Sequence, residues 1–306
     1  MNKILVTGAS GFIGVNLINY LQSKQFKILA FSRKLGMDYH IIDPNYINDN
    51  EVNIIIHLAG QAHDLQNVIN DQVYSKANTQ LTIDIFTAFL TSKAKIFIYF
   101  SSVKAVKDHF DSILTENTEA NPISAYGKSK LAAENHILPK FELANKKIYI
   151  LRPCLIHGPE NKGNLNLLYN IISNQIPWPL GAFDNKRSFC CIDNLCFVVN
   201  ELIIRSDIPN GIYNIADDNT LSTNNLISLI GQSLNRKPKI LSFNRNLIKI
   251  IAKIGDIFNL PLNSEKLNKL TESYVVSNAK IKAAIAKELP FSTEAGLLKT
   301  FHSFIK

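Results

Sequence analysis

Tyr126 and Lys130 have the spacing of an acid–base pair. They stand four positions apart in the run Tyr126-Gly127-Lys128-Ser129-Lys130, so on a helix their side chains lie one turn apart on the same face. A free phenol has a pKa of about 10, which is too high for easy proton transfer at neutral pH. A nearby ammonium group stabilises the phenolate and lowers that pKa. We therefore expect Tyr126 to exchange a proton with a substrate and Lys130 to tune it.

A glycine-rich loop near the start of the chain has the pattern of a dinucleotide-binding site. It follows the apolar stretch Lys3–Thr7 and precedes apolar residues at helical spacing. In such a strand–loop–helix unit the glycines allow a tight turn and let the backbone approach a pyrophosphate, which binds free N–H groups at the helix N-terminus. A glycine turn without a ligand is the alternative. We expect cofactor contacts from Gly8, Ser10, Gly11, Phe12, Ile13 and Gly14.

The residues after the second expected strand indicate which cofactor is bound. Sites for NAD usually place an acid there, about 20 residues past the glycine loop, to bind the ribose hydroxyls. Here Phe31 is followed by Ser32, Arg33 and Lys34. A carboxylate would repel a 2′-phosphate, whereas Arg33 and Ser32 would bind it. The sequence therefore predicts NADP(H) as the preferred cofactor and NAD(H) as the alternative, in which case Arg33 would only stack on the adenine.

Short β-branched stretches alternate with helical patterns through the first half of the chain. The expected strands are Lys3–Thr7, Lys27–Phe31, Tyr39–Ile42, Asn53–Ala59, Lys95–Ser101 and Lys147–Arg152. Helical patterns lie between the later strands, near Val68–Thr91 and Tyr126–Leu143. Such alternation predicts an α/β fold with a doubly wound parallel Rossmann sheet that is covered by helices on both faces.

The pattern changes beyond about residue 160, where helices and short strands mix. Three serines, Ser222, Ser277 and Ser292, have the positions of helix N-caps there. We predict a dinucleotide-binding Rossmann domain over residues 1–160. A smaller, mixed α/β C-terminal substrate lobe would occupy residues 161–306, partly interwoven with the first domain.

The composition is that of a globular protein. Of 306 residues, 46% are hydrophobic and the net charge is +8, and no apolar run approaches the ~20 residues of a membrane helix. The lysines are scattered and no nucleic-acid-binding motif stands out, which argues against nucleic acid as a partner. Met1–Val6 runs into glycines without a cleavage-type site, so a cytoplasmic protein is expected. The four cysteines fit no metal or disulfide spacing, which predicts buried thiols and no metal site.

One basic amphipathic stretch leaves two interpretations open. Between Arg245 and Phe258, apolar residues recur at helical spacing together with Lys249 and Lys253. A helix of this kind can lie on a membrane surface. More often its apolar stripe is the core face of a lobe with a solvated basic rim. We favour the core face and expect no stable membrane insertion.

Several motifs together resemble the extended short-chain dehydrogenase/reductases that act on nucleotide sugars, and the resemblance covers nearly the whole chain. They are the glycine motif Thr7–Gly14, His57-Leu58-Ala59-Gly60 at the end of a strand, the helix residue Asn78, the pair Ser101-Ser102, and Tyr126 with Lys130. The resemblance implies that Ser102 bonds the substrate oxygen beside Tyr126, with Ser101 as the alternative. It also implies that Lys130 binds the cofactor ribose and that Leu58, Ala59 and Gly60 lie near the nicotinamide ribose.

The same resemblance places substrate contacts in the second half of the chain. Lys162, Gly163 and Asn164 follow where the family contacts the nucleotide diphosphate, and Arg187 resembles the family's arginine on the substrate side. An arginine suits a diphosphate because its fork binds two oxygens, although a surface ion pair is the alternative. The implied substrate-binding residues are Lys104, Asn164, Leu180 and Arg187.

Three runs resemble a narrower branch of the family. They are Ser101-Ser102-Val103-Lys104, the turn Ile176–Gly181, and Asn185–Phe189. That branch reduces the C4 ketone of UDP-linked 6-deoxy-N-acetylhexosamines for surface polysaccharides. The resemblance therefore implies an NADP(H)-dependent 4-ketoreductase with a UDP-sugar substrate, acting as a homodimer through the helices around Asn78 and Tyr126.

Other functions of the same residues stay open at this point. A UDP-hexose 4-epimerase would use the same catalytic set with tightly bound NAD. A dinucleotide-binding sensor without catalysis would not need the intact set of Ser102, Tyr126 and Lys130. A dehydratase would need an acidic pair beside the catalytic hydroxyl, where this chain has Val103-Lys104.

Overall fold

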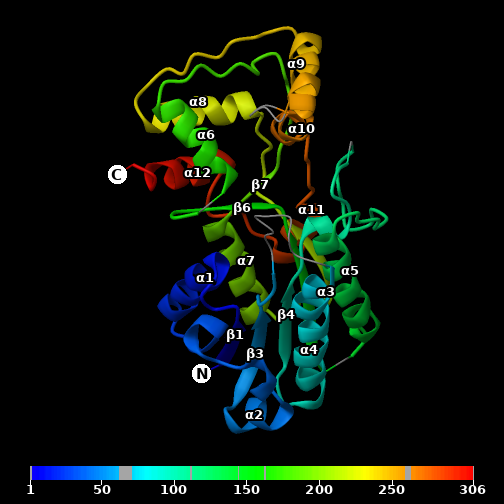
Figure 1. Cartoon of the computed structure of the whole chain (residues 1–306). Coiled ribbons are helices and arrows are strands. Elements are labelled where there is room, and N and C mark those ends of the chain that lie inside the picture. Colours follow the sequence, from blue (N-terminus) through cyan, green and yellow to red (C-terminus); the bar gives the residue numbers. More distant parts are fainter. Residues whose placement is uncertain are drawn as a thin grey trace.

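A parallel sheet of six strands forms the centre of the molecule, in the order β2-β1-β3-β4-β5-β8 (Figure 1). The computed structural model describes residues 2–61, 71–110, 112–143, 145–161, 163–258 and 263–305. The strands are β1 (Lys3–Thr7), β2 (Lys27–Phe31), β3 (Val52–His57), β4 (Ile96–Phe100), β5 (Lys147–Pro153) and β8 (Gly211–Ile215). All five neighbouring pairs are parallel. The strand order reverses between β1 and β3, which is where an open sheet of this kind binds its ligands.

Helices bury both faces of the sheet. Alternate residues of β1 point in opposite directions, so Ile4 and Val6 join one apolar core and Leu5 joins the other. The first core is covered by α1 (Phe12–Ser23), α7 (Ile192–Ile204) and α11 (Ala279–Ile285). The second is covered by α2 (Pro44–Asp49), α4 (Leu81–Thr91) and α5 (Ala125–Ile137). The doubly wound Rossmann-type fold predicted from the sequence is thereby confirmed.

One expected strand is wrong. The residues Tyr39–Ile41 form a short 3₁₀ helix, η2, and α2 follows it directly. Two aspartates explain the difference, because the Asp38 carboxylate accepts from His40 N–H at 3.0 Å and the Asp43 carboxylate accepts from Tyr46 N–H at 2.7 Å. These caps favour helical turns over an extended strand. The sixth strand is instead β8, from the second half of the chain.

The helical segment before β4 differs in detail from the expected helix near Val68–Thr91. Its first residues, 68–70, lie outside the described residues. From Asp71 on, the chain is helical through α3 (Asp71–Tyr74), the π-helical segment η3 (Ser75–Gln80) and α4. The helix expected near Tyr126–Leu143 is present as α5, followed by the 3₁₀ turn η5 (Leu138–Lys140).

A second group of elements lies above the sheet in Figure 1, over the carboxyl ends of its strands. It contains the paired strands β6 (Leu155–His157) and β7 (Phe189–Cys191) and the helices α6 (Asn164–Ser173), α8 (Thr223–Ser233), α9 (Arg245–Phe258), α10 (Ser264–Thr271) and α12 (Thr293–His302). Trp178, Leu226 and Phe301 belong to its own apolar core. Ser222 and Ser292 cap α8 and α12 as expected, whereas α11 begins two residues beyond Ser277, with Asn278 at its N-cap position.

The chain returns to the sheet after residue 160. Leu195 and Val199 of α7, Tyr213 of β8 and Ile281 of α11 all belong to the apolar core beneath α1. The expected boundary at residue 160 therefore stays a prediction, because the sheet also takes residues from beyond it.

Helix α9 contradicts the interpretation of its apolar stripe as a core face. Of its large apolar residues only Ile248 is buried, together with the small Ala252 and Gly255. Six others are exposed, namely Leu247, Ile250, Ile251, Ile254, Ile257 and Phe258. The lobe covers only a narrow stripe of the helix, and the broad apolar side faces outward.

Candidate active site

The glycine loop joins β1 to α1 at the carboxyl edge of the sheet. Gly8 has a φ of +70°, and a Cβ there would lie 2.8 Å from the backbone nitrogen of Ala59. A Cβ on Gly14 would lie 2.4 Å from the carbonyl oxygen of Gly8. Both positions therefore need glycine, and the loop is pressed against Leu58 and Ala59. The N-terminus of α1 starts at Phe12 with free N–H groups, which suits the pyrophosphate of a dinucleotide.

The end of β2 lies beside this loop. Ser32 is buried, and its hydroxyl shares a short hydrogen bond with the Ser10 hydroxyl and accepts from Lys34 N–H at 3.2 Å. Arg33 begins the exposed 3₁₀ turn η1 (Arg33–Leu35), and its side chain makes no hydrogen bond or ion pair with any residue that the structure describes. The Tyr39 hydroxyl accepts from Gly8 N–H at 3.3 Å, a contact that the sequence did not predict.

His57 closes β3 beneath the expected nicotinamide ribose site. Its Nδ1 lies 2.8 Å from the Thr7 hydroxyl and its Nε2 lies 3.0 Å from the Thr82 hydroxyl. Because Thr82 gives its own proton to the Asn78 carbonyl at 2.6 Å, His57 Nε2–H is the donor to Thr82. Burial, and then the charge of Lys130, lower the pKa of His57 to about 3. The ring is therefore neutral at physiological pH and anchors the turn at Leu58–Gly60.

We expect the buried His57 to make the protein acid-sensitive. Its pKa is about 3 in the folded chain, against an ordinary value of 6.5 for the exposed side chain of the unfolded chain. At pH values between these two pKa values, His57 binds a proton in the unfolded chain and stays neutral in the folded chain. The free energy of unfolding therefore falls with decreasing pH, by about 1.4 kcal/mol per unit for this proton. Urea unfolding at pH 4–6 gives the free energy of unfolding as a function of pH. The slope of that free energy against pH should be shallower for His57→Asn than for the wild type by about that amount. The matched control is exposed His302→Asn, and equal slopes for His57→Asn and the wild type would contradict the assignment.

Helix α5 carries the expected proton donor. The helix is capped by Ser124, whose hydroxyl accepts from Gly127 N–H at 3.1 Å and donates to the Asp108 carboxylate at 2.6 Å. Tyr126 is the second residue of the helix and Lys130 follows one turn later. Ser102 caps the 3₁₀ turn η4 (Val103–Ala105) after β4, and its hydroxyl lies near enough to the Tyr126 phenol to lower the pKa of that phenol. The structure thus brings Ser102 to Tyr126.

The serine next to it, Ser101, does not take this position. Ser101 is buried, and its hydroxyl has no hydrogen-bond partner among the residues that the structure describes. Successive residues of an extended chain point in opposite directions, so only one of the pair can face Tyr126. The geometry favours Ser102 over Ser101 as the hydroxyl beside the tyrosine.

Burial determines the protonation of Tyr126 and Lys130. It raises the pKa of Tyr126 to about 12, against the opposing effect of the Ser102 hydroxyl, so the phenol holds its proton at neutral pH. Burial lowers the pKa of Lys130 to about 8, against the opposing charge of Glu134. The Lys130 ammonium donates to the Phe100 carbonyl at 2.8 Å and lies 4.9 Å from the centre of the Tyr99 ring. Tyr126 is therefore arranged to give a proton, and its tuning by Lys130 stays a prediction.

Asn78 connects the cofactor side of the site to the catalytic helix. Its side-chain nitrogen donates to the Ser129 hydroxyl at 2.9 Å, and its oxygen accepts from Gln61 N–H at 2.7 Å. A Cβ on Gly60 would lie 2.6 Å from that oxygen and 3.5 Å from the Lys130 nitrogen. Asn78 stands in the π-helical segment η3, a distortion that often marks a functional site.

Arg187 has the surroundings of an anion-binding residue. Its Nη1 donates to the Lys269 carbonyl at 2.9 Å, while its Nε is buried with no hydrogen-bond partner in the described ranges. Burial lowers its pKa, against the opposing effects of Tyr274 and Glu272. A buried guanidinium nitrogen without a partner is costly unless a ligand satisfies it.

The structure shows the positions of the other expected substrate residues but gives weaker reasons for a contact with a ligand. Lys104 is exposed on η4, two residues after Ser102. Leu180 has its side chain in the apolar core of the lobe, so any contact with a ligand would come from its backbone. Asn164 is the first residue of α6, and Lys162 lies outside the described residues.

Two tyrosines near Tyr126 were not predicted from the sequence. The Tyr74 ring meets the Tyr126 ring edge-on, with centroids 6.2 Å apart. Tyr274 pairs with Arg187 through the backbone and packs on Phe110, with ring centroids 4.5 Å apart. Burial raises the pKa of Tyr274, and Asp108 and Tyr126 are among the nearby groups that raise it further. Tyr274 thus pairs with Arg187 and lies near enough to Asp108 and Tyr126 for their charges to raise its pKa, and no local pattern in the sequence marks it.

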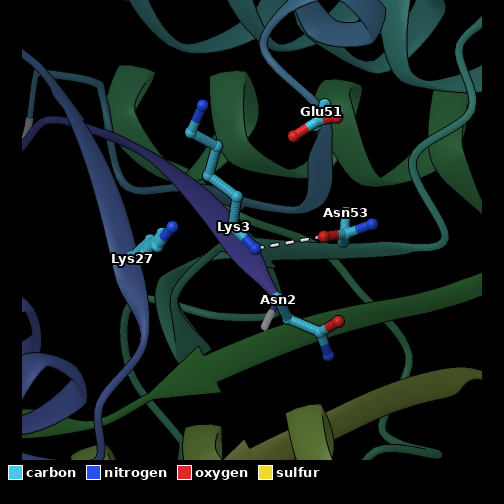
Figure 2. A pocket seen from close by; sticks show the side chains of 5 residues that line it. All are labelled: Asn2, Lys3, Lys27, Glu51 and Asn53. Carbon is cyan, nitrogen blue, oxygen red and sulfur yellow. Dashed lines mark hydrogen bonds between the residues drawn. The ribbon is translucent and has the colours of Figure 1, made fainter.

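A polar pocket at the opposite edge of the sheet is separate from this site (Figure 2). It is lined by Asn2, Lys3, Lys27, Glu51 and Asn53, which stand at the amino ends of β1, β2 and β3. Ligands of open α/β sheets bind at the carboxyl ends of the strands. The pocket in Figure 2 therefore lies at the opposite edge of the sheet from the expected cofactor site.

Some features of the described residues limit the chemistry. Within the described ranges no group of three or more His, Cys, Asp or Glu side chains could hold a metal ion, and all four cysteines are free thiols. No helix in the described part of the chain is long and apolar enough to cross a membrane. The side chains that gather at the carboxyl edge are those of a proton donor, its hydroxyl partner and an ammonium group.

Comparison with known proteins identifies the class. Residues 4–216 match the NAD dependent epimerase/dehydratase family, so the chain belongs to that family of nucleotide-sugar epimerases, dehydratases and reductases. It is 26% identical to the UDP-glucose 4-epimerase of Vibrio cholerae, over 99% of this chain and 96% of that protein.

Solved structures agree on the fold. UDP-N-acetylglucosamine 4-epimerase from Bacillus cereus superposes with a TM-score of 0.77 at 19% identity, over 100% of both chains. RMD from Pseudomonas aeruginosa, which was solved in complex with NADPH, superposes with a TM-score of 0.73 at 19% identity, over 99% of this chain and 98% of that one.

Proposed function

We propose that this enzyme is an NADP(H)-dependent reductase of the C4 ketone in a UDP-linked 6-deoxy-N-acetylhexosamine, a step in surface polysaccharide synthesis. The observation that carries the proposal is the end of β2, where Ser32 and Arg33 stand in place of a carboxylate and the Arg33 side chain has no partner among the described residues. That arrangement favours the 2′-phosphate of NADP(H). The protonated phenol of Tyr126 supports reduction, because a ketone that accepts a hydride also needs a proton.

The residues of the site fit the cofactor and the substrate. The cradle formed by Gly8 and Gly14 has no space for any Cβ, which suits the approach of a pyrophosphate. When bound, NADP(H) would supply the hydride. Tyr126 would give its proton to the C4 oxygen, and Ser102 would hold that oxygen by a hydrogen bond. Arg187 would bind the diphosphate of UDP with the nitrogen that has no partner in the described residues.

A 4-epimerase is the second candidate. It is favoured by the Vibrio cholerae relative, which matches this chain over almost its whole length. An epimerase would use the same three side chains but would need no net reductant. It would keep NAD bound through gel filtration, whereas a reductase must exchange its cofactor in every turnover. A sensor without catalysis is disfavoured by the position of the Ser102 hydroxyl near the Tyr126 phenol.

The decisive assay for the proposal is incubation with UDP-4-keto-6-deoxy-N-acetylglucosamine and either NADPH or NADH. We expect NADPH to be consumed in proportion to the sugar reduced, and NMR to show a hydroxyl at C4. If the protein instead interconverts UDP-hexoses with no loss of NADPH, the epimerase is correct.

Arg33 is expected to determine the cofactor preference. Hydrogen bonds to a charged group contribute about 1.5–3 kcal/mol, so Arg33→Ala should weaken NADPH binding by about 10- to 100-fold. The affinity for NADH should change little. Fluorescence titration with both cofactors measures this, with Lys27→Ala at the opposite end of β2 as the matched control. Equal losses for NADPH and NADH would mean that Arg33 only stacks on the adenine.

Three further aspects belong to this proposal. The partner is a UDP-sugar, and the four free thiols suit a reducing, cytoplasmic location. The enzyme would form a homodimer through α4 and α5, the helices that follow Asn78 and carry Tyr126. Sedimentation velocity would give the oligomeric state directly.

A further inference from the structure

Helix α9 presents an apolar surface that no described part of the chain covers. Ile248, Ala252 and Gly255 face the lobe at positions i, i+4 and i+7 and are buried. On the outer side lies a set that we call the α9 apolar face. Its members and their exposed fractions are Leu247 (51%), Ile250 (55%), Ile251 (41%), Ile254 (44%), Ile257 (74%) and Phe258 (68%). Figure 1 shows α9 at the end of the lobe farthest from the six-stranded sheet.

Basic residues border the α9 apolar face. With 100° per residue, Arg245, Lys249 and Lys253 form a basic strip that begins beside the buried Ala252 and runs toward the α9 apolar face, with the exposed Asp256 within it. All three basic residues are exposed. The helix therefore has three sides: a buried seam, an exposed apolar face and a basic strip. A helix that served only as part of the lobe would need the buried seam and the basic strip, but no exposed apolar face.

Helix α9 itself carries a positive charge. Between Arg245 and Phe258 it has three basic residues and one acidic residue, a net charge of +2. An anionic surface is the complement of such a region. A second copy of this chain is not, since a two-fold contact would put the same basic strips opposite each other.

We propose that α9 docks the enzyme on an anionic lipid membrane. The α9 apolar face would lie at the boundary of headgroups and acyl chains, while Lys249 and Lys253 would reach lipid phosphates. This inference goes beyond the proposed function and does not depend on it. Its consequence for the site follows from the packing. Helix α10, which packs against α9, holds Arg187 through the Lys269 carbonyl, so docking would place the substrate side of the enzyme at the membrane.

Co-sedimentation with extruded vesicles tests the proposal on the purified full chain. We expect binding to phosphatidylcholine vesicles that contain 50% phosphatidylglycerol, and little binding to pure phosphatidylcholine. Binding should weaken as salt rises from 0.05 to 0.5 M, because the lysine contribution is screened. A wild-type protein that stays in the supernatant with anionic vesicles at low salt would overturn the proposal.

Two double variants separate the apolar and basic contributions. Lys249→Glu with Lys253→Glu should weaken partitioning at least 25-fold, since each basic residue near the surface contributes about fivefold. Ile250→Asp with Ile254→Asp should abolish binding. All four side chains are exposed, so NADPH affinity and the melting temperature should stay unchanged.

Matched controls come from exposed residues elsewhere. Ile204→Asp, at the end of α7, and Lys140→Glu, in η5, should bind vesicles as the wild type does. Equal losses from these controls and from the α9 variants would contradict a specific surface. A dimer that dissociates on Ile250→Asp with Ile254→Asp, in a protein that ignores vesicles, would assign the α9 apolar face to self-association instead.

Discussion

Tyr126→Phe is expected to lower kcat by about 10²- to 10⁴-fold, the usual contribution of a positioned proton donor. The Tyr126 side chain is half-buried, its phenol is protonated, and it lies near the Ser102 hydroxyl. Phenylalanine keeps the ring and its edge-on contact with Tyr74 and removes only the hydroxyl group that carries the proton. The affinity for the cofactor should therefore stay within about twofold of the wild type. Single-turnover kinetics with NADPH and the keto sugar would measure the chemical step itself.

The neighbouring tyrosine gives the matched control for this prediction. Tyr74→Phe removes a hydroxyl from the ring that packs on Tyr126, but the phenol that lies near the Ser102 hydroxyl is that of Tyr126. The Tyr74 variant should therefore keep most of the activity. If Tyr74→Phe were as slow as Tyr126→Phe, or if Tyr126→Phe kept its full rate, Tyr126 would not be the proton donor.

Arg152→Met is expected to lower the free energy of unfolding by about 3–5 kcal/mol, the usual cost of leaving one partner of a buried ion pair alone. Arg152 lies in β5, and its Nε donates to the Glu134 carboxylate of α5 at 2.9 Å, with a second hydrogen bond from Nη2. Both side chains are buried, with exposed fractions of 5% and 0%. Without Arg152, Glu134 must keep an uncompensated charge or take up a proton.

Urea unfolding of Arg152→Met measures this loss, and two further variants define it. Lys269→Met breaks the exposed pair with Glu265 on α10 and should cost no more than about 0.5 kcal/mol. Arg152→Met combined with Glu134→Leu should recover much of the stability, because it removes the uncompensated carboxylate. A stability of Arg152→Met equal to that of the Lys269→Met control would contradict the assigned role of the pair.

The Glu134 carboxylate also connects stability to catalysis. Its charge opposes the fall in the pKa of Lys130, which burial lowers to about 8. One turn of α5 therefore carries Lys130 toward the cofactor side and Glu134 toward β5. The pair of Arg152 and Glu134 holds helix α5 against the sheet.

The parts of the fold that could be predicted depend on short-range patterns. Gly8 and Gly14 stand where a Cβ would strike the backbone, so the glycine loop was recognisable from the sequence. The strand expected at Tyr39–Ile42 was wrong because its aromatic and β-branched residues suit both states, and the capping aspartates Asp38 and Asp43 decide for helical turns. The strand β8 could not be predicted as the sixth strand, because its pairing with β5 is fixed by tertiary packing.

The candidate site likewise contains residues that local motifs predict and residues that only tertiary packing places. Ser102, Tyr126 and Lys130 belong to local motifs, and the structure brings Ser102 to Tyr126. Tyr274 comes from a segment far along the chain and reaches the site only through its backbone pairing with Arg187. The direction of the Lys130 ammonium toward the Phe100 carbonyl also depends on packing, since the spacing alone suggested a closer relation to the phenol.

The most direct test of the account follows the hydride. The enzyme would be incubated with UDP-4-keto-6-deoxy-N-acetylglucosamine and NADPH that carries deuterium at both positions of C4 of the nicotinamide, and the sugar would be examined by NMR. We predict one deuterium at C4 of the sugar for every NADPH oxidised, with Tyr126→Phe forming almost none. A sugar product without deuterium, formed while NADPH stays intact, would contradict the reductase.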